Sequence, residues 1–221
     1  MDPAVIQLLV LAGIAVFLIM RLRSVLGSRD GFEKPPVNGS APQDNAPAPR
    51  RFEVIEGGPD TDITDHVDED SPEAKALARM KEVDPDFSVT DFLSGARGAY
   101  EMILMSFENG TLDDILPFLS RDVFESFDEV VQIREREGLR VEAEFVGVRE
   151  LELVGATFDE DSAEAELTVR YVGELTSVVR NAEDEIIEGD PNVIKRQKDV
   201  WTFARNMRSD SPNWKLVATG G

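Results

Sequence analysis

A long uncharged segment near the start of the chain constrains the fold more than any other feature of the sequence. Residues 4–20 include no charged side chain, and Gln7 is their one polar side chain. As a helix rising about 1.5 Å per residue, the segment spans roughly 25 Å, slightly less than the ~30 Å hydrocarbon core of a bilayer. The sequence therefore predicts a membrane anchor. Its apolar residues and the arginines that follow them are Ala4, Val5, Ile6, Leu8, Leu9, Val10, Leu11, Ile14, Val16, Phe17, Leu18, Ile19, Met20, Arg21 and Arg23.

The charges on either side of this segment predict the orientation of the anchor. Asp2 precedes it, whereas Arg21 and Arg23 follow it directly. Lys and Arg are retained on the cytoplasmic side, so we expect a single-pass protein with its N-terminus outside and its C-terminal domain in the cytoplasm. A cleaved secretory signal is the main alternative, but such a signal has its positive charge before the apolar run. A helix buried in a soluble core is a second alternative, which needs other elements to surround it.

Charge is distributed unevenly along the chain, whose formal net charge is −21. Residues 1–34 have a net charge of +1, so the remainder has −22. Nucleic acid and anionic lipid repel such an acidic body, so no nucleic-acid partner is expected. The charge either suits a basic protein partner or serves solubility. The chain has no cysteine, which excludes disulfides, thiol catalysis and zinc–thiolate sites.

Composition divides the chain into three parts. Residues 1–23 comprise the anchor and its basic flank. Residues 24–70 are rich in Pro, Ala, Asn and Asp and have few side chains to bury, which predicts a disordered linker. Residues 71–221 return to the periodic apolar patterns of a folded domain.

Start and stop signals predict the helices of this domain. Ser71 followed by Pro72 is typical of a helix N-cap and first turn. Ser88 begins a second helix, which Gly110 ends after a series of apolar residues at helical spacing. The predicted helices are 71–83, 88–109, a short helix or turn over 111–119 broken at Pro117, and 120–138.

After Gly138 the period of the apolar residues changes from 3.6 to 2, which is typical of strands. A tight turn over 158–162 and a solvated loop over 181–192 interrupt the pattern. The predicted strands are 141–153, 163–179, 200–205 and 214–219. Helices followed by a run of antiparallel strands predict an α+β domain, in which the sheet curls around apolar helix faces.

Motifs for catalysis or metal binding do not stand out in the sequence. His66, the one histidine, belongs to the predicted linker, and no phosphate loop, nucleophile elbow or zinc-protease motif occurs. We therefore predict no catalytic residue, no cofactor and no metal site. The remaining candidates are large side chains that either pack the core or line an apolar pocket between sheet and helices. They are Tyr100, Ile103, Phe107, Phe124, Phe127, Trp201, Phe203 and Trp214.

Three segments point to a known family: DFSVTDFLSGARGAYEMILMSFENG, LPFLSRDVFESFDEVVQIREREG and DVWTFARNMRSDSPNWKLVAT. Together they resemble the Tim forty-four-like domain, the C-terminal part of a membrane-associated subunit of the mitochondrial import motor. The anchor, the segment RLRSVLG and the acidic linker are more similar to the bacterial TimA-type branch. The most specific match comprises Trp201, Phe203, Arg205, Asn213, Trp214, Leu216 and Thr219.

This resemblance implies a cone of helices on a curved antiparallel sheet, similar to nuclear-transport-factor-2-like proteins. It also implies a non-catalytic adaptor at the bacterial inner (plasma) membrane, with a translocase or an Hsp70-type chaperone as partner. The mitochondrial relatives engage the chaperone and channel through a long N-terminal region that differs from this one. Their chaperone-docking residues therefore cannot be placed on this sequence.

Two other functions stay open at this stage. The first is binding of a lipid or another apolar ligand, either in a pocket or through the helix near residues 74–80, which has Lys75, Arg79 and Lys81 close by. The second is an enzyme, because cone-shaped relatives of this fold place a base and a tyrosine inside the cone. An acidic side chain deep in the domain beside Tyr100 or Tyr171 would favour the enzyme.

Overall fold

The computed structural model describes residues 59–220, so the predicted anchor and most of the predicted linker lie outside the described residues. Within residues 59–220, no helix is both long and apolar enough to span a bilayer. The described helices and strands are α2 (Thr61–Thr64), α3 (Pro72–Val83), α4 (Val89–Asn109), the 3₁₀ helix η1 (Leu112–Phe118), α5 (Arg121–Arg136), β1 (Arg140–Asp159), β2 (Glu164–Arg180), β3 (Ile186–Gly189), β4 (Lys195–Asn206) and β5 (Lys215–Gly220).

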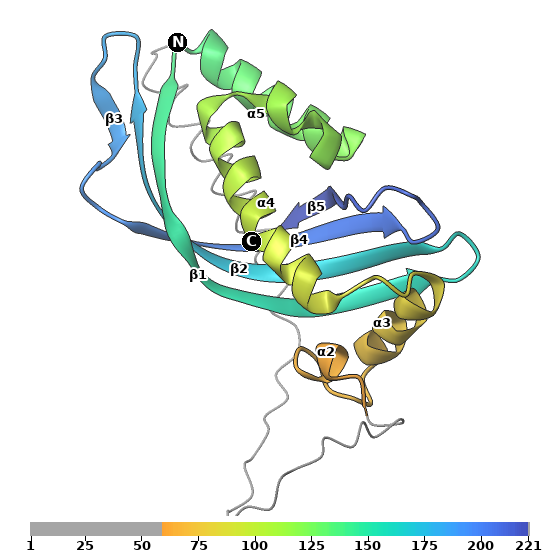
Figure 1. Cartoon of the computed structure of the whole chain (residues 1–221). Coiled ribbons are helices and arrows are strands. Elements are labelled where there is room, and N and C mark those ends of the chain that lie inside the picture. Colours follow the sequence, from red (N-terminus) through yellow and green to blue (C-terminus); the bar gives the residue numbers. More distant parts are fainter. Residues whose placement is uncertain (1–58, 221) are drawn as a thin grey trace, which may run out of the picture. The chain divides into compact units, whose positions relative to one another are not determined.

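All five strands belong to one antiparallel sheet, in the order β1-β2-β4-β5. Strand β4 pairs with residues 164–175 of β2. The short strand β3 pairs with residues 178–180, at the C-terminal end of β2. The sheet is curved, and α4 lies across its inner face (Figure 1). The architecture is therefore α+β, with helices packed on a curved antiparallel sheet, as the sequence predicts.

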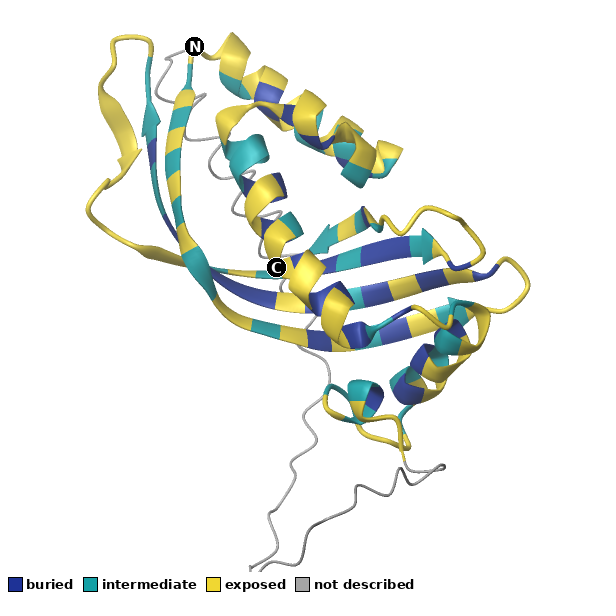
Figure 2. Cartoon of the chain, in the orientation of Figure 1, coloured by how far each residue is buried: buried dark blue, intermediate teal, exposed yellow. Residues whose placement is uncertain are grey.

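Helix α4 begins and ends where its sequence signals predict. The side chain of Ser88 accepts a hydrogen bond from the backbone N–H of Asp91 at 3.2 Å. Gly110 ends the helix in the left-handed conformation, at φ 71°, which costs little for glycine. The inner face of α4 and the alternate residues of β2 and β4 form one core (Figure 2). Burial of the apolar side chains of α4 against those of β2 and β4 stabilises the domain.

Strands β1 and β4 are longer than the sequence predicts, whereas β2 and β5 have about the predicted lengths. Strand β1 continues beyond the predicted 141–153 to Asp159, and register shifts interrupt its pairing with β2. The segment 181–192, predicted as a loop, contains β3. An isolated pair of isoleucines among acidic residues is a weak strand pattern, and β3 forms because the end of β2 offers it a partner.

The folded region also begins earlier than residue 71, the start that the sequence patterns predict. Helix α2 precedes α3, and its Ile63 is buried. The carboxylate of Asp62 accepts backbone hydrogen bonds from Val89 at 2.8 Å and Thr90 at 2.9 Å. These contacts join α2 to the first turn of α4, so at least residues 60–67 of the predicted linker are structured by tertiary contacts that local composition does not reveal.

Candidate functional site

The inner face of the sheet is filled by stacked aromatic side chains. Tyr100 of α4 and Tyr171 of β2 are fully buried and stack with ring centroids 4.4 Å apart. Trp201 of β4 packs against Tyr100 at 4.8 Å. Aromatic pairs at these separations contribute about 0.5–1.5 kcal/mol each beyond the apolar area they bury. This aromatic cluster fills the space between α4 and the inner face of the sheet.

An acidic side chain does lie beside Tyr100. The Tyr100 hydroxyl donates to Oδ2 of Asp199 at 2.6 Å, and Gln197 Nε2 donates to Oδ1 at 3.1 Å. Burial raises the pKa of the Asp199 carboxyl, and the hydrogen bonds from Tyr100 and Gln197 partly oppose that rise. Burial also raises the pKa of Tyr100, and the neighbouring carboxylate raises it further. The pair thus holds a partly buried carboxylate and a neutral phenol in a fixed geometry.

The hydroxyl of Tyr100 is enclosed on its other side by the backbone of β2. A Cβ atom added at Gly173 would lie 2.5 Å from the Tyr100 hydroxyl oxygen, closer than van der Waals contact allows. The phenol therefore touches glycine backbone instead of open space. This enclosure makes the hydrogen bond to Asp199 a structural contact.

A small cavity of ≈ 150 Å³ adjoins the pair, between α4, α5 and β4. Its walls include Asp199 and Glu108. Burial raises the pKa of Glu108, and Arg134 and Lys195 partly oppose that rise. Ligand sites for drug-sized molecules are typically about 300–1,000 Å³. The cavity is therefore too small to admit more than a few solvent molecules.

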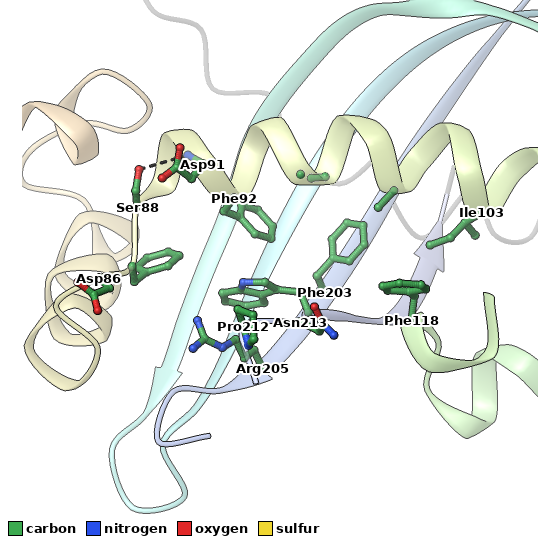
Figure 3. A pocket seen from close by; sticks show the side chains of 15 residues that line it. Asp86, Ser88, Asp91, Phe92, Ile103, Phe118, Phe203, Arg205, Pro212 and Asn213 are labelled. Atoms are coloured by element: carbon green, nitrogen blue, oxygen red, sulfur yellow. Dashed lines mark hydrogen bonds between the residues drawn. The ribbon is translucent and has the colours of Figure 1, made fainter. Parts of the chain in front are cut away.

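A larger pocket of ≈ 330 Å³ opens between the first half of α4 and the end of the sheet. Phe92 and Phe203 face one another in it, and Phe118 lines one end (Figure 3). Trp214 also lines the pocket and packs against Phe92 at 4.8 Å. Small residues of α4, among them Gly95 and Ala99, form one wall. The pocket is mainly apolar, and Asp86, Ser88, Asp91, Arg205 and Asn213 also line it.

An ion pair sits at the rim of this pocket. Arg205 Nη2 lies 2.8 Å from Asp84, and only 10% and 18% of these side chains are exposed. Arg205 Nε also donates to the backbone carbonyl of Ser211 at 3.0 Å. The pair connects the α3–α4 junction to β4 and to the loop before β5. Because its charge is already compensated by Asp84, Arg205 is not a free anion-binding group.

The candidate residues from the sequence occupy several places in the structure. Tyr100, Ile103, Trp201 and Phe203 are buried in the core, and Phe107, Phe124, Phe127 and Trp214 pack against it partly exposed. The larger pocket is lined by Ile103, Phe203 and Trp214. The small cavity is lined by Ile103, Phe107, Phe127 and Trp201. Phe124 lines a separate, polar hollow near Gly110.

Sequence reasoning missed Asp199, although the strand pattern contains the information. Asp199, Trp201 and Phe203 alternate along β4 and share its inner face, and Asp199 stands opposite Tyr171 of β2. An acidic residue in strict alternation with buried aromatics is a signal for a buried carboxyl.

The proposed lipid-facing side of α3 points into the protein. Leu77 and Met80 are fully buried in the core. Lys81 forms ion pairs with Asp60 at 2.7 Å and Asp62 at 2.8 Å, and Arg79 pairs with Glu82 at 2.9 Å. The apolar face of this helix is therefore not available to a bilayer.

Fold and site together define an α+β domain with an aromatic interior and an apolar pocket at one end. The profile of the Tim44-like domain matches residues 73–221, and the chain belongs to this family.

Curated relatives give the same assignment. The chain is 23% identical over 147 residues to the mitochondrial import inner membrane translocase subunit TIM44 of Homo sapiens, and 22% identical to that of Rattus norvegicus. Each match covers 65% of this chain and 32% of the relative, so the chain matches about a third of their length. A solved structure, the intermembrane space region of the chloroplast protein ARC6, is similar with a TM-score of 0.36 at 15% identity, over 57% of this chain and 94% of that one.

Proposed function

We propose that this protein is a membrane-tethered, non-catalytic adaptor that holds a protein partner at the bacterial inner membrane. Its relatives are subunits of an inner-membrane translocase, which supports a role in protein translocation. Residues 4–20 serve as the anchor, residues 24–58 as the tether, and the Tim44-like domain as the binding part in the cytoplasm. The fine architecture of that domain is the nuclear-transport-factor-2-like cone, and the branch is TimA-type. The partner is a translocase component or an Hsp70-type chaperone.

One observation supports the non-catalytic assignment most directly. The pair formed by Tyr100 and Asp199 resembles the base and donor of a cone-shaped enzyme, but both groups are engaged with each other. Gln197 and Gly173 enclose the two remaining sides, and the adjoining cavity of ≈ 150 Å³ is below the size of a substrate site. A base and a donor that bind each other beside so small a cavity are better suited to packing than to catalysis.

The adaptor is tested by in-cell crosslinking of the full-length chain followed by mass spectrometry. A truncated chain of residues 1–58 is the matched control, because it retains the anchor and tether but lacks the described domain. We expect proteins crosslinked to the full chain and absent from the control. Recovery of the same proteins at the same yield from both would contradict the adaptor.

The pocket of ≈ 330 Å³ supports a second function, binding of an apolar segment or acyl chain. Its volume is within the range of small-molecule sites, and several aromatic side chains line its walls. The carboxylates of Asp86 and Asp91 line the pocket as well, and Arg205 is already paired with Asp84. The surroundings thus disfavour an anionic head group and favour an uncharged apolar ligand.

Tryptophan fluorescence tests this pocket, because the chain has two tryptophans and Trp214 is the one that lines the pocket. In a Trp201→Phe background, an uncharged brominated acyl ester should quench Trp214. Gly95→Leu should abolish quenching by filling the pocket, since a Cβ at Gly95 meets nothing within 4 Å. Gly98→Leu is the matched control, with equal space around its Cβ but no place in the pocket wall. Equal quenching in both leucine variants would exclude ligand binding here.

A further inference from the structure

Four aliphatic side chains are exposed on the connection between β2 and β4. We call residues 181–194 the β3 arm, since β3 is its central part. Single exposed apolar residues are normal on protein surfaces, but a cluster on one projecting segment indicates an interaction site. Figure 2 shows β3 exposed along its whole length. The four side chains and their exposed fractions are Ile186 at 43%, Ile187 at 50%, Val193 at 51% and Ile194 at 54%.

The β3 arm also presents a free strand edge. Within residues 59–220, β3 pairs with β2 along one edge and has no strand on its other edge. The edge continues along the first half of β4, since β5 begins its pairing at Val200 and leaves Lys195–Asp199 without a strand on that side among the described residues. Unpaired N–H and C=O groups along such an edge are a template for adding another strand.

The arm is held in a defined conformation by local contacts. Gly189 has a φ of 86°, and a Cβ there would lie 2.1 Å from the carbonyl oxygen of Ser177. Arg140 pairs with Asp184 at 2.7 Å at the base of the turn. Arg180 donates to the backbone carbonyl of Asp184 at 2.9 Å. The edge is therefore pre-formed, which lowers the entropic cost of adding a strand.

Charge indicates which kind of partner fits. Residues 181–194 include five acidic side chains and no Lys or Arg, and of the five only Asp184 has an ion-pair partner among the described residues. The first half of β4 differs from the arm, because it includes Lys195, Arg196 and Lys198, of which Arg196 is compensated by Glu174 at 2.9 Å. The acidic part of the free edge is therefore β3 and the residues that flank it. A second copy of this chain has the same net charge of −21 and is repelled, as is an anionic bilayer. The surface matches a basic segment that also has aliphatic side chains.

We propose that the β3 arm binds an extended, basic and aliphatic polypeptide segment as an added strand along β3. Main-chain hydrogen bonds provide affinity in this mode, and alternate side chains provide specificity. The aliphatic side chains of the segment contact the exposed isoleucines, and its Lys and Arg side chains neutralise the acids of the arm. This deepens the adaptor proposal by naming the chemistry of a partner segment, and it rests on that proposal for its role in the cell.

The test measures binding of a fluorescent peptide, Lys-Ile-Lys-Val-Lys-Ile-Lys, to the full-length chain in detergent micelles by anisotropy. We expect saturable binding that weakens as salt is raised. Ile187→Lys should weaken it by about tenfold or more, because it adds a like charge and removes an apolar contact. Val154→Lys is the matched control on β1, exposed to 38%, and should change affinity less than about twofold.

Further controls separate strand addition from other forms of binding. A peptide with alternate N-methylated amides should bind about tenfold more weakly, since it cannot pair with the edge. Equal affinity of the methylated peptide, equal effects of the two lysine variants, or a homodimer that Ile187→Lys disrupts would each overturn the proposal. The proposal would also be overturned if anionic vesicles displaced the peptide and Ile187→Lys left the peptide affinity unchanged. Peptide binding alongside an empty crosslinking result would refute the adaptor while supporting the arm.

Discussion

At the residue scale, the hydrogen bond from Tyr100 to Asp199 links the aromatic cluster to a partly buried acidic side chain. It joins two partly desolvated groups, and removal of one partner leaves the other buried without compensation. Loss of this hydrogen bond should therefore lower the free energy of unfolding more than loss of most single hydrogen bonds.

Tyr100→Phe should destabilise the domain by about 1.5–3 kcal/mol at pH 8, as expected for a hydrogen bond to a charged group. The bond lowers the pKa of Asp199 against the rise caused by burial, so its loss raises that pKa further. The cost of the variant should then decrease as pH falls and Asp199 takes up a proton. Chemical denaturation over a series of pH values from pH 8 downward measures the difference.

Tyr171→Phe is the matched control for this experiment. The Tyr171 hydroxyl donates to the uncharged carbonyl of Ala96 at 3.2 Å, so its loss should cost about 1 kcal/mol. The cost should be independent of pH between 5 and 8. A similar pH dependence in both variants would show that Asp199 does not titrate through its contact with Tyr100.

Gly173→Ala tests the enclosure of the same hydroxyl. The added methyl group would overlap the hydroxyl of Tyr100, whose ring is fully buried and cannot easily move. Overpacking of this kind costs about 1–3 kcal/mol. In the Tyr100→Phe background the cost should be smaller, because the overlapping oxygen is gone. A double-mutant cycle measures this coupling, and simple additivity would contradict it.

At the element scale, the first turn of α4 depends on a residue outside the predicted domain. Burial alone would raise the pKa of Asp62, but hydrogen bonds from Lys81, Thr90 and Val89 outweigh it, and the pKa is lowered. Asp62 therefore joins three helices at one carboxylate. Its contribution to stability requires the charged form.

Asp62→Ala should destabilise the domain by about 1–3 kcal/mol at pH 7, since it removes a helix cap and an ion pair. A lowered folded-state pKa gives stability that is present above the ordinary value of 3.8 and is lost as pH falls further. The difference from the unmutated chain should thus diminish below that pH. Urea titrations between pH 7 and pH 3 follow it, with exposed Asp65→Ala as control. An effect of equal size at pH 3 would contradict this origin.

The elements also show what the sequence could and could not predict. The ends of α4 followed from Ser88 and Gly110, because caps are local signals. Helix α2 was missed because its partner is the N-terminus of α4. The contact joins Asp62 to Val89, which are 27 residues apart along the chain. Strand β3 was missed because it pairs with the far end of β2, through Ile186, Glu188 and Gly189, and not with a neighbour that its own sequence reveals. For the site, the aromatic residues were predictable as a group, whereas Asp199 required the register of β4.

At the scale of the whole molecule, the proposed function depends on a domain that is tethered close to a bilayer. Tethering raises the effective concentration of a partner at the membrane without any new contact. The strongly negative net charge keeps the domain away from anionic head groups and available to basic polypeptides. The anchor at residues 4–20 is therefore the central claim, because both the location and the use of the domain depend on it.

Membrane fractionation with protease protection tests that claim most directly. The full-length chain should remain in the membrane fraction after carbonate extraction of isolated membranes. In spheroplasts, external protease should digest its C-terminal domain only after lysis. A chain lacking residues 1–23 should move to the soluble fraction. Full-length protein in the soluble fraction, or digestion of the domain in intact spheroplasts, would contradict the membrane-tethered adaptor.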